Sequence, residues 1–242
     1  MSLPLSVYKR MPKRMPYSLG FDRYALYFDG VDDYVEIPHS PSLNLYPNFT
    51  LEYIARWHSW TGIDKPLDKT KSSSEGWSHR YNADTRKFGF WDPVNTWTES
   101  DPVDLELLRW YHITVTYNGT VLSFYINGKL LTAVTVNIPS TIDSDESLRI
   151  GGGGLPVYPQ PMNGEIAFVR IYNRPLSEKE IRYNMLNYHN PVRDGLVLWL
   201  DFEEGHGDKV YDKSGHGNHG TIYGGAKWVR VRQYELRAEV GL

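Results

Sequence analysis

Residues 110–132 have the sequence WYHITVTYNGTVLSFYINGKLLT, in which two Asn-Gly pairs separate three runs of alternating side chains. Asn-Gly is typical of two-residue hairpin turns, because both residues tolerate a positive φ and the resulting backbone twist suits the flanking strands. In the first run Ile113, Val115 and Tyr117 alternate with His and Thr side chains. This period of two predicts an antiparallel three-stranded meander with one face in a dry core.

The same alternation, rich in β-branched and aromatic residues, recurs along most of the chain. Turn-forming Gly, Asn, Asp and Pro residues separate these runs. The sequence therefore predicts an all-β protein, with further strands at Tyr24–Phe28, Tyr34–Ile37, Phe49–Trp57, Ser147–Ile150, Gly164–Tyr172 and Gly195–Phe202, and near TIY and AKWV in the last forty residues.

One short helix is predicted at Glu178–Asn187. Ser177 is suited to the N-cap, and Glu180 three residues later completes the pattern of a capping box. Ile181, Met185 and Tyr188 recur at helical spacing and form the expected buried stripe.

Composition excludes several classes of protein. The chain has 242 residues, 40% of them hydrophobic and 14% aromatic, which suits one β-sandwich of 200–250 residues. The net charge of −3 predicts no nucleic-acid partner, and the absence of cysteine leaves packing to supply the stability. No run of apolar residues is long enough for a membrane span, and no secretory signal is recognisable.

Several stretches together resemble the laminin-G-like jelly roll of the concanavalin A-like lectin/glucanase superfamily. They cover roughly residues 25–229, and the resemblance implies an antiparallel jelly-roll β-sandwich. The stretches are WYHITVTYNGTVLSFYINGKLL, SLRIGGG, GEIAFVRIYNRPLSEKEI, ALYFDGVDDYVEIPHSPSLNL and GLVLWLDFEE with DKSGHGNHGTIYGGAKWV.

The order of these stretches differs from that of most relatives, in which the sequence found here at 195–230 comes first. A sandwich without those strands exposes apolar edges. We therefore expect a domain at 24–230 that is circularly permuted, or whose strands at 195–230 are swapped into a neighbouring subunit. Residues 1–23 are expected to be a basic, proline-rich arm, and residues 231–242 a tail or extra edge strand.

Three carboxylates lie in the tight turn at Asp29, Asp32 and Asp33. Ca²⁺ takes several oxygen ligands from carboxylates and carbonyls, and many relatives bind a structural Ca²⁺ near such a turn. The resemblance thus implies calcium as a possible cofactor, although this chain has Ile166–Phe168 where relatives often have an aspartate. The alternative is that these residues serve only the turn.

Five tryptophans, Trp57, Trp60, Trp77, Trp91 and Trp97, flank or occupy two segments that we expect to be long loops, at residues 58–78 and 89–106. A flat indole ring matches the apolar face of a pyranose, so at least two of these rings are candidates for a sugar-binding platform. The alternative is that half or more of them belong to the core between the sheets.

Two constellations invite a test for catalysis or metal binding. Asp104 and Glu106 have the spacing of paired carboxylates, but they lie in a proline-punctuated loop and the Glu-x-Asp-x-Glu pattern of superfamily hydrolases is missing. The histidines near Asp212, among them His216 and His219, match no known metal-ligand spacing, and their glycine neighbours favour turns.

These observations predict a non-catalytic, laminin-G-like recognition or assembly module with no enzymatic activity. The expected partner is a glycan or a surface protein, with self-association through the arms or through swapped strands. The resemblance places such a module outside cells or on a virion surface, in adhesion or in a particle. Two alternatives stay open, namely a glycoside hydrolase or lyase of the same superfamily, and a purely structural shell or decoration subunit.

Overall fold

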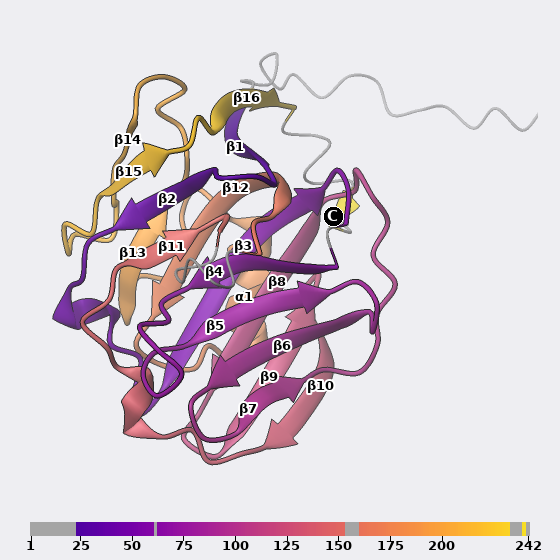
Figure 1. Cartoon of the computed structure of the whole chain (residues 1–242), viewed down its shortest axis with the longest axis vertical. Helices are drawn as coiled ribbons and strands as arrows, with labels where there is room; N and C mark the ends of the chain where they lie inside the picture. The colour runs from indigo at the N-terminus through magenta and orange to yellow at the C-terminus, as the bar shows by residue number, and fades with distance from the viewer. Residues whose placement is uncertain (1–22, 61, 153–159, 233–238, 241–242) are drawn as a thin grey trace, which may run out of the picture.

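The computed structural model of the chain describes residues 23–60, 62–152, 160–232 and 239–240. Two antiparallel sheets pack face to face, as the sequence predicts for a jelly-roll sandwich (Figure 1). From edge to edge the back sheet contains β10 (Lys129–Thr135), β9 (Val121–Ile126), β8 (Tyr111–Tyr117), β3 (Phe49–Trp57), β12 (Asn163–Tyr172), β1 (Arg23–Asp29) and β16 (Lys227–Val231), with β13 (Leu196–Leu200) also paired to β12.

The front sheet lies nearer the viewer in Figure 1. Its strands in spatial order are β14 (Lys209–Val210), β15 (Gly220–Tyr223), β2 (Tyr34–Ile37), β11 (Leu148–Ile150), β4 (Ile63–Asp68), β5 (Ser78–Asn82), β6 (Lys87–Asp92) and β7 (Thr96–Glu99). Two short 3-10 turns, Pro41–Leu43 and Ser140–Ile142, lie between strands. The main hydrophobic core fills the space between the sheets and includes residues such as Leu51, Val115 and Phe90.

The meander that the two Asn-Gly pairs predict is β8–β9–β10 of the back sheet. Gly119, Asn127 and Gly128 have positive φ values of 91°, 49° and 70°, as tight hairpin turns require. The prediction of a single dry face is too narrow, because every residue of β8 is buried. The polar face of β8, which includes His112 and Thr114, lies beneath the helix and its flanking chain.

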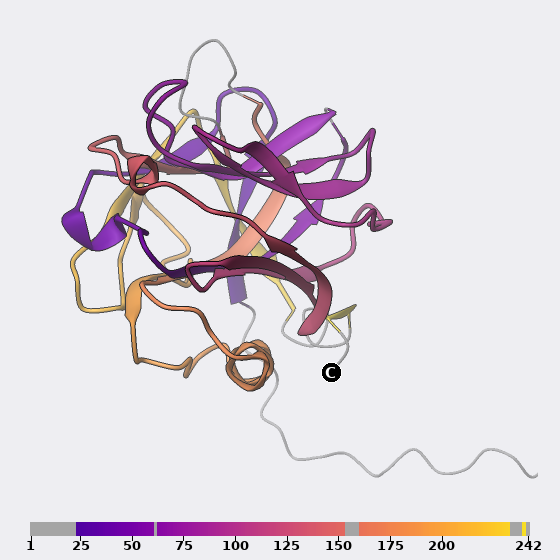
Figure 2. The same cartoon turned by 90° about the horizontal axis from the view of Figure 1, so that it is seen from below.

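Helix α1 (Glu178–Leu186) has the predicted capping box. The Ser177 side chain accepts a hydrogen bond from the N–H of Glu180, and the Glu180 carboxylate accepts one from the N–H of Ser177 at 2.8 Å. Ile181, Met185 and Tyr188 are buried as expected. Figure 2 shows this helix outside the back sheet, on the side away from the front sheet.

The late segment 195–230 completes the sandwich within its own chain. Strand β13 pairs with β12, β15 pairs with β2, and β16 pairs with β1. Arg23 lies opposite Val231, so the first described residue and the end of β16 are neighbours, as a circular permutation requires.

Two segments predicted as long loops contain strands, and the prediction was wrong for those residues. Residues 58–78 contain β4, and residues 89–106 contain most of β6 and all of β7. Pro66 of β4 lies at a bulge between Asp64 and Leu67, where a missing N–H is tolerated. Aromatic side chains on both faces of β6 obscured its period of two.

The two ends of the chain fall partly outside the described residues. Residues 1–22 of the predicted arm and residues 233–238 and 241–242 of the predicted tail are not described. Val240 is buried against the cluster that contains Ile54 and Trp110, and Glu239 accepts a hydrogen bond from the Trp110 N–H at 2.8 Å. Residues 239–240 of the tail therefore pack on the domain.

Candidate functional site

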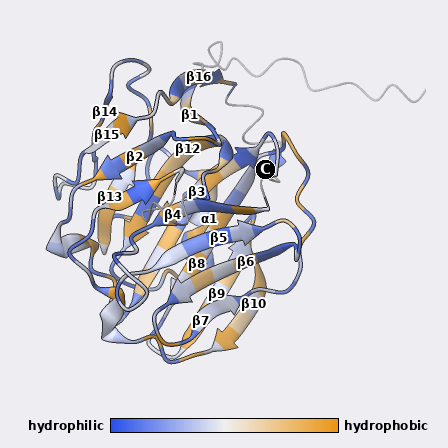
Figure 3. Cartoon of the chain, viewed as in Figure 1, coloured by the Kyte–Doolittle hydropathy of each residue, from blue (hydrophilic) through white to orange (hydrophobic). Residues whose placement is uncertain are grey.

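The outer face of the front sheet brings side chains from distant parts of the chain into one row. Registered pairs join Arg149 to Asp68, Asp68 to Ser78, Ser78 to Trp91, and Trp91 to Trp97. These residues alternate with core residues, so their side chains face away from the other sheet. Figure 3 shows blue and pale colours dominating on β5 and β6 of this sheet.

A pocket of about 360 Å³ opens at β4–β7 of this face. Its size falls within the range of small-molecule sites, about 300–1,000 Å³. The side chains that matter for its chemistry are hydroxyls, cations and rings, namely Thr70, Ser78, Lys65, Arg80, Trp91 and Trp97.

The charged groups of the pocket are paired with carboxylates. The Lys65 ammonium lies 3.2 Å from Asp68, and the Arg80 guanidinium lies 2.9 Å from Glu99. Ser78 donates to Asp68 at 3.1 Å. Donors and acceptors thus lie side by side with little net charge, an arrangement that suits a ligand rich in hydroxyl groups.

Arg80 and Trp97 support each other beside the pocket. The Arg80 guanidinium stacks over the Trp97 ring at 3.6 Å from its centroid. Burial lowers the pKa of Arg80, although the hydrogen bond that Arg80 donates to Glu99 opposes the shift. Nε of Arg80 is buried against β6 and has no hydrogen-bond partner in the described part of the chain.

Gly89 makes this stack possible. A Cβ at this position would lie 2.9 Å from Cε3 of Trp97 and 3.3 Å from Nε of Arg80. Only a residue without a side chain lets both groups lie flat against β6.

The five tryptophans of the predicted platform separate into two groups. Trp57 and Trp77 are fully buried between the sheets, and Trp60 packs against Trp57 at 5.5 Å between ring centroids. Trp91 and Trp97 lie on the outer face and line the pocket. Both rings are partly exposed. One face of the Trp97 ring is covered by Arg80, and the described residues show no such contact for Trp91.

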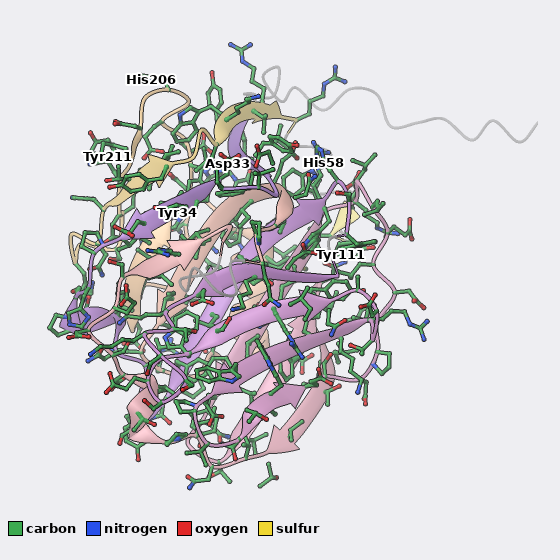
Figure 4. The ribbon with its side chains drawn as sticks, in the orientation of Figure 1. Asp33, Tyr34, His58, Tyr111, His206 and Tyr211 are labelled. Carbon is green, nitrogen blue, oxygen red and sulfur yellow. The ribbon has the colours of Figure 1, made fainter. Side chains whose placement is uncertain are left out.

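The acidic turn forms a compact group at the junction of β1 and β2. Candidate ligand atoms of Asp29, Asp32 and Asp33 all lie within 4.8 Å of one another. Asp33, labelled in Figure 4, is 3% exposed and accepts a hydrogen bond from the Asp29 N–H at 2.9 Å through Oδ2. Burial raises the pKa of Asp33, and the charges of Asp29 and Asp32 add to this effect.

The donor set of this turn fits a divalent cation. Oδ1 of Asp33 is buried without a hydrogen-bond partner in the described residues, which is costly for a carboxylate unless a cation is near. Gly224 has a φ of 78° and packs against the turn, where a Cβ would lie 2.3 Å from the Asp32 carbonyl oxygen. The turn is therefore held closely by the β15–β16 connection.

The constellations tested for catalysis and metal binding lie elsewhere and have structural partners. Asp104 is exposed and pairs with Arg86, and Glu106 is exposed and pairs with Arg109, each at 2.9 Å. Asp212 accepts hydrogen bonds from the backbone N–H groups that shape the 212–218 turn.

Sequence reasoning missed the polar part of the pocket. Lys65 and Arg80 come from β4 and β5, which were not recognised as neighbouring strands of one sheet. The alternation in SHRYN and KFGFWD was the available signal, since it sets Arg80 and Trp91 on the face opposite to Tyr81 and Phe90.

Comparison with known proteins identifies the family. A laminin G family model, described as the concanavalin A-like lectin/glucanases superfamily, matches residues 29–182, more than half of the chain. The chain belongs to this superfamily. The matched residues do not include the strands at 195–230, which the resemblance seen in the sequence does include. None of the curated proteins matches the sequence.

Solved structures share the superfamily fold at low identity. A candidate carbohydrate-binding protein from Bacteroides ovatus ATCC 8483 aligns with a TM-score of 0.71 and 17% identity over 87% of this chain and 60% of that one. A heptameric SAP-like pentraxin from Limulus polyphemus aligns with a TM-score of 0.62 and 13% identity over 86% and 95%. A Trypanosoma rangeli sialidase in complex with sialic acid aligns with a TM-score of 0.52 and 19% identity, over 68% and 28%.

The chain thus spans about 60% of the length of the Bacteroides protein and a smaller part of the sialidase. At these identities the likeness shows the fold alone. No helix in the described ranges is long and apolar enough to cross a membrane.

Proposed function

We propose that this protein is a non-catalytic carbohydrate-recognition module whose ligand occupies the pocket at β4–β7. The observation that supports this most directly is the unstacked Trp91 ring beside two ion pairs in a pocket of about 360 Å³. An aromatic ring with adjacent donors and acceptors is the chemistry that recognises a sugar ring, one apolar face and a rim of hydroxyl groups. The carbohydrate-binding assignment of the Bacteroides neighbour agrees with this proposal.

A glycan array followed by titration calorimetry tests the proposal. Trp91→Ala is expected to weaken binding of the array's best glycan by about tenfold or more, because a central aromatic contact is lost. Trp228→Ala is the matched control, since this tryptophan is also partly buried but lies on β16 of the back sheet. The proposal fails if the wild type binds no glycan, or if Trp91→Ala binds as tightly as the control.

We also propose that Ca²⁺ binds at Asp29, Asp32 and Asp33 and ties the β1–β2 turn to the domain. The buried, unpartnered Oδ1 of Asp33 supports this assignment. Ca²⁺ is expected to raise the melting temperature of the wild type but not of Asp33→Asn, whereas Asp145→Asn, an exposed acidic control in another loop, responds like the wild type. An equal response of Asp33→Asn and wild type to Ca²⁺ contradicts the site.

We also propose that the protein acts outside cells or on a virion surface, where its partner is a glycan or a surface protein. Self-association belongs to the same proposal, and light scattering after size exclusion measures it. A clean monomer at all concentrations rules self-association out.

A further inference from the structure

A second aromatic pair lies on the same outer face of the front sheet, far from the pocket. Tyr34 of β2 and Tyr223 of β15 are registered partners, and their rings stack at 5.2 Å with an interplanar angle of 22°. Tyr223 is 44% exposed. The Arg149 guanidinium lies over the Tyr34 ring at 5.0 Å, which holds the pair in place from one side.

A continuous polar row connects this tyrosine pair with the pocket. Thr221 is registered with Glu36, Glu36 with Arg149, and Arg149 with Asp68. Lys209 donates to Thr221 at 2.6 Å, and Arg149 lies 3.3 Å from Glu36. The Glu36 and Arg149 side chains of this row are partly exposed, whereas Asp68 lies buried beneath it beside the pocket.

The separation of the two aromatic pairs sets the size of the ligand. Four strand-to-strand steps lead from β2 to β6, through β11, β4 and β5. At ~4.8 Å a step this is about 19 Å, several times the width of one sugar ring. A single ring can touch Trp91 or Tyr34 but not both.

We infer that the ligand is an extended oligosaccharide that crosses the strands of the front sheet, with a second subsite at Tyr34 and Tyr223. This inference rests on the proposed carbohydrate binding at the pocket and adds the length and direction of the ligand. Two linked subsites bind a chain more tightly than either binds one ring, because the second contact becomes intramolecular.

A length series tests the second subsite by calorimetry. The probes are laminari-, cello-, xylo- and manno-oligosaccharides, from the disaccharide to the hexasaccharide, and the series that the wild type binds is used for the variants. In the wild type the affinity is expected to rise about tenfold or more from the shortest to the longest probe. Tyr34→Ala and Tyr223→Ala are expected to remove this rise and leave binding of the disaccharide unchanged.

Controls separate loss of the subsite from loss of the fold. Tyr183→Ala removes a tyrosine of similar exposure, 41%, from α1 on the opposite side of the molecule and is expected to keep the rise. Tyr34→Phe keeps the aromatic ring and is also expected to keep the rise of affinity with chain length. Trp91→Ala lowers the affinity at every length.

The outcomes distinguish the two proposals. If Tyr34→Ala and Tyr223→Ala keep the full rise with chain length, the second subsite is wrong, whereas carbohydrate binding at Trp91 stands. If no probe of any length binds the wild type or depends on Trp91, the proposed function fails, and the inference fails with it.

Discussion

The two outer faces of the sandwich carry similar charged groups in opposite surroundings. On the back sheet, whose outer side carries α1 (Figure 2), Glu52, His112 and Arg170 are fully buried. Asn184 of α1 donates a hydrogen bond to Glu52, and Arg170 donates one to the carbonyl oxygen of Tyr188. On the front sheet Arg80 lines the pocket, and the side chain of its partner Glu99 is 26% exposed. An ion pair between arginine and glutamate is thus fully buried on the back sheet and partly exposed on the front sheet.

The buried network leaves little of its carboxylate for any other partner. Glu52 contacts Nε2 of His112 at 2.8 Å, Nη1 of Arg170 at 3.2 Å and Nδ2 of Asn184 at 3.0 Å. Burial by itself raises the pKa of Glu52, but the charge of Arg170 and the bond with His112 bring it below its ordinary value. The helix thus covers this face, and the proposed ligand site lies on the face that has no helix.

The largest effect is expected from removing the buried charge. Glu52→Gln leaves Arg170 buried without its counter-charge, which costs about 3–5 kcal/mol of unfolding free energy. Glu99→Gln is the matched variant on the open face, where solvent limits the cost to about 1 kcal/mol or less. Urea denaturation at neutral pH measures both, and equal losses would contradict the contrast between the faces.

A second, smaller effect is expected on the pH dependence of stability, through His79 on the inner side of the front sheet. Nε2 of His79 lies 2.9 Å from the Tyr53 hydroxyl and Nδ1 lies 3.0 Å from the Gly89 carbonyl oxygen, so neither partner is a carboxylate. Burial lowers the pKa of His79 from 6.5 to about 4, although the bond to Gly89 opposes the shift.

The pKa of His79 is lower in the folded than in the unfolded protein. The contribution of neutral His79 to the free energy of unfolding is therefore fully present above pH 6.5 and is lost as the pH falls toward 4. The change corresponds to about 3 kcal/mol. His79→Gln, compared with the wild type by denaturation at several pH values, is expected to flatten this window. An unchanged slope between pH 6.5 and 4 in the variant would remove His79 as its cause.

The smallest effect on stability is expected from a substitution beneath the Arg80–Trp97 stack of the front sheet. In Gly89→Ala the new Cβ displaces the Trp97 ring and the Arg80 side chain, at a cost of about 1 kcal/mol. Glycan affinity is expected to fall several-fold in calorimetry. Val94→Ala, an exposed site in the same hairpin, should leave affinity unchanged. Wild-type affinity in Gly89→Ala would mean that the Arg80–Trp97 stack plays no part in binding.

Local patterns predicted much of the fold. The Asn-Gly hairpins and the Ser177–Glu180 capping box were found because a few neighbouring residues determine these geometries. Strands β4, β6 and β7 were missed because their outer positions hold Lys65, Trp91 and Trp97, so that polar and apolar side chains do not alternate cleanly.

The sequence by itself determined an all-β chain of alternating strands, the one capped helix, and the three carboxylates of the β1–β2 turn, since each depends on residues close together in the chain. Only the tertiary structure decided that Trp77 is buried, whereas Trp91 is partly exposed and lines a pocket together with Lys65 and Arg80. A period of two assigns side chains to two faces of a strand. Which face meets the core depends on pairing between distant strands and on what covers each sheet.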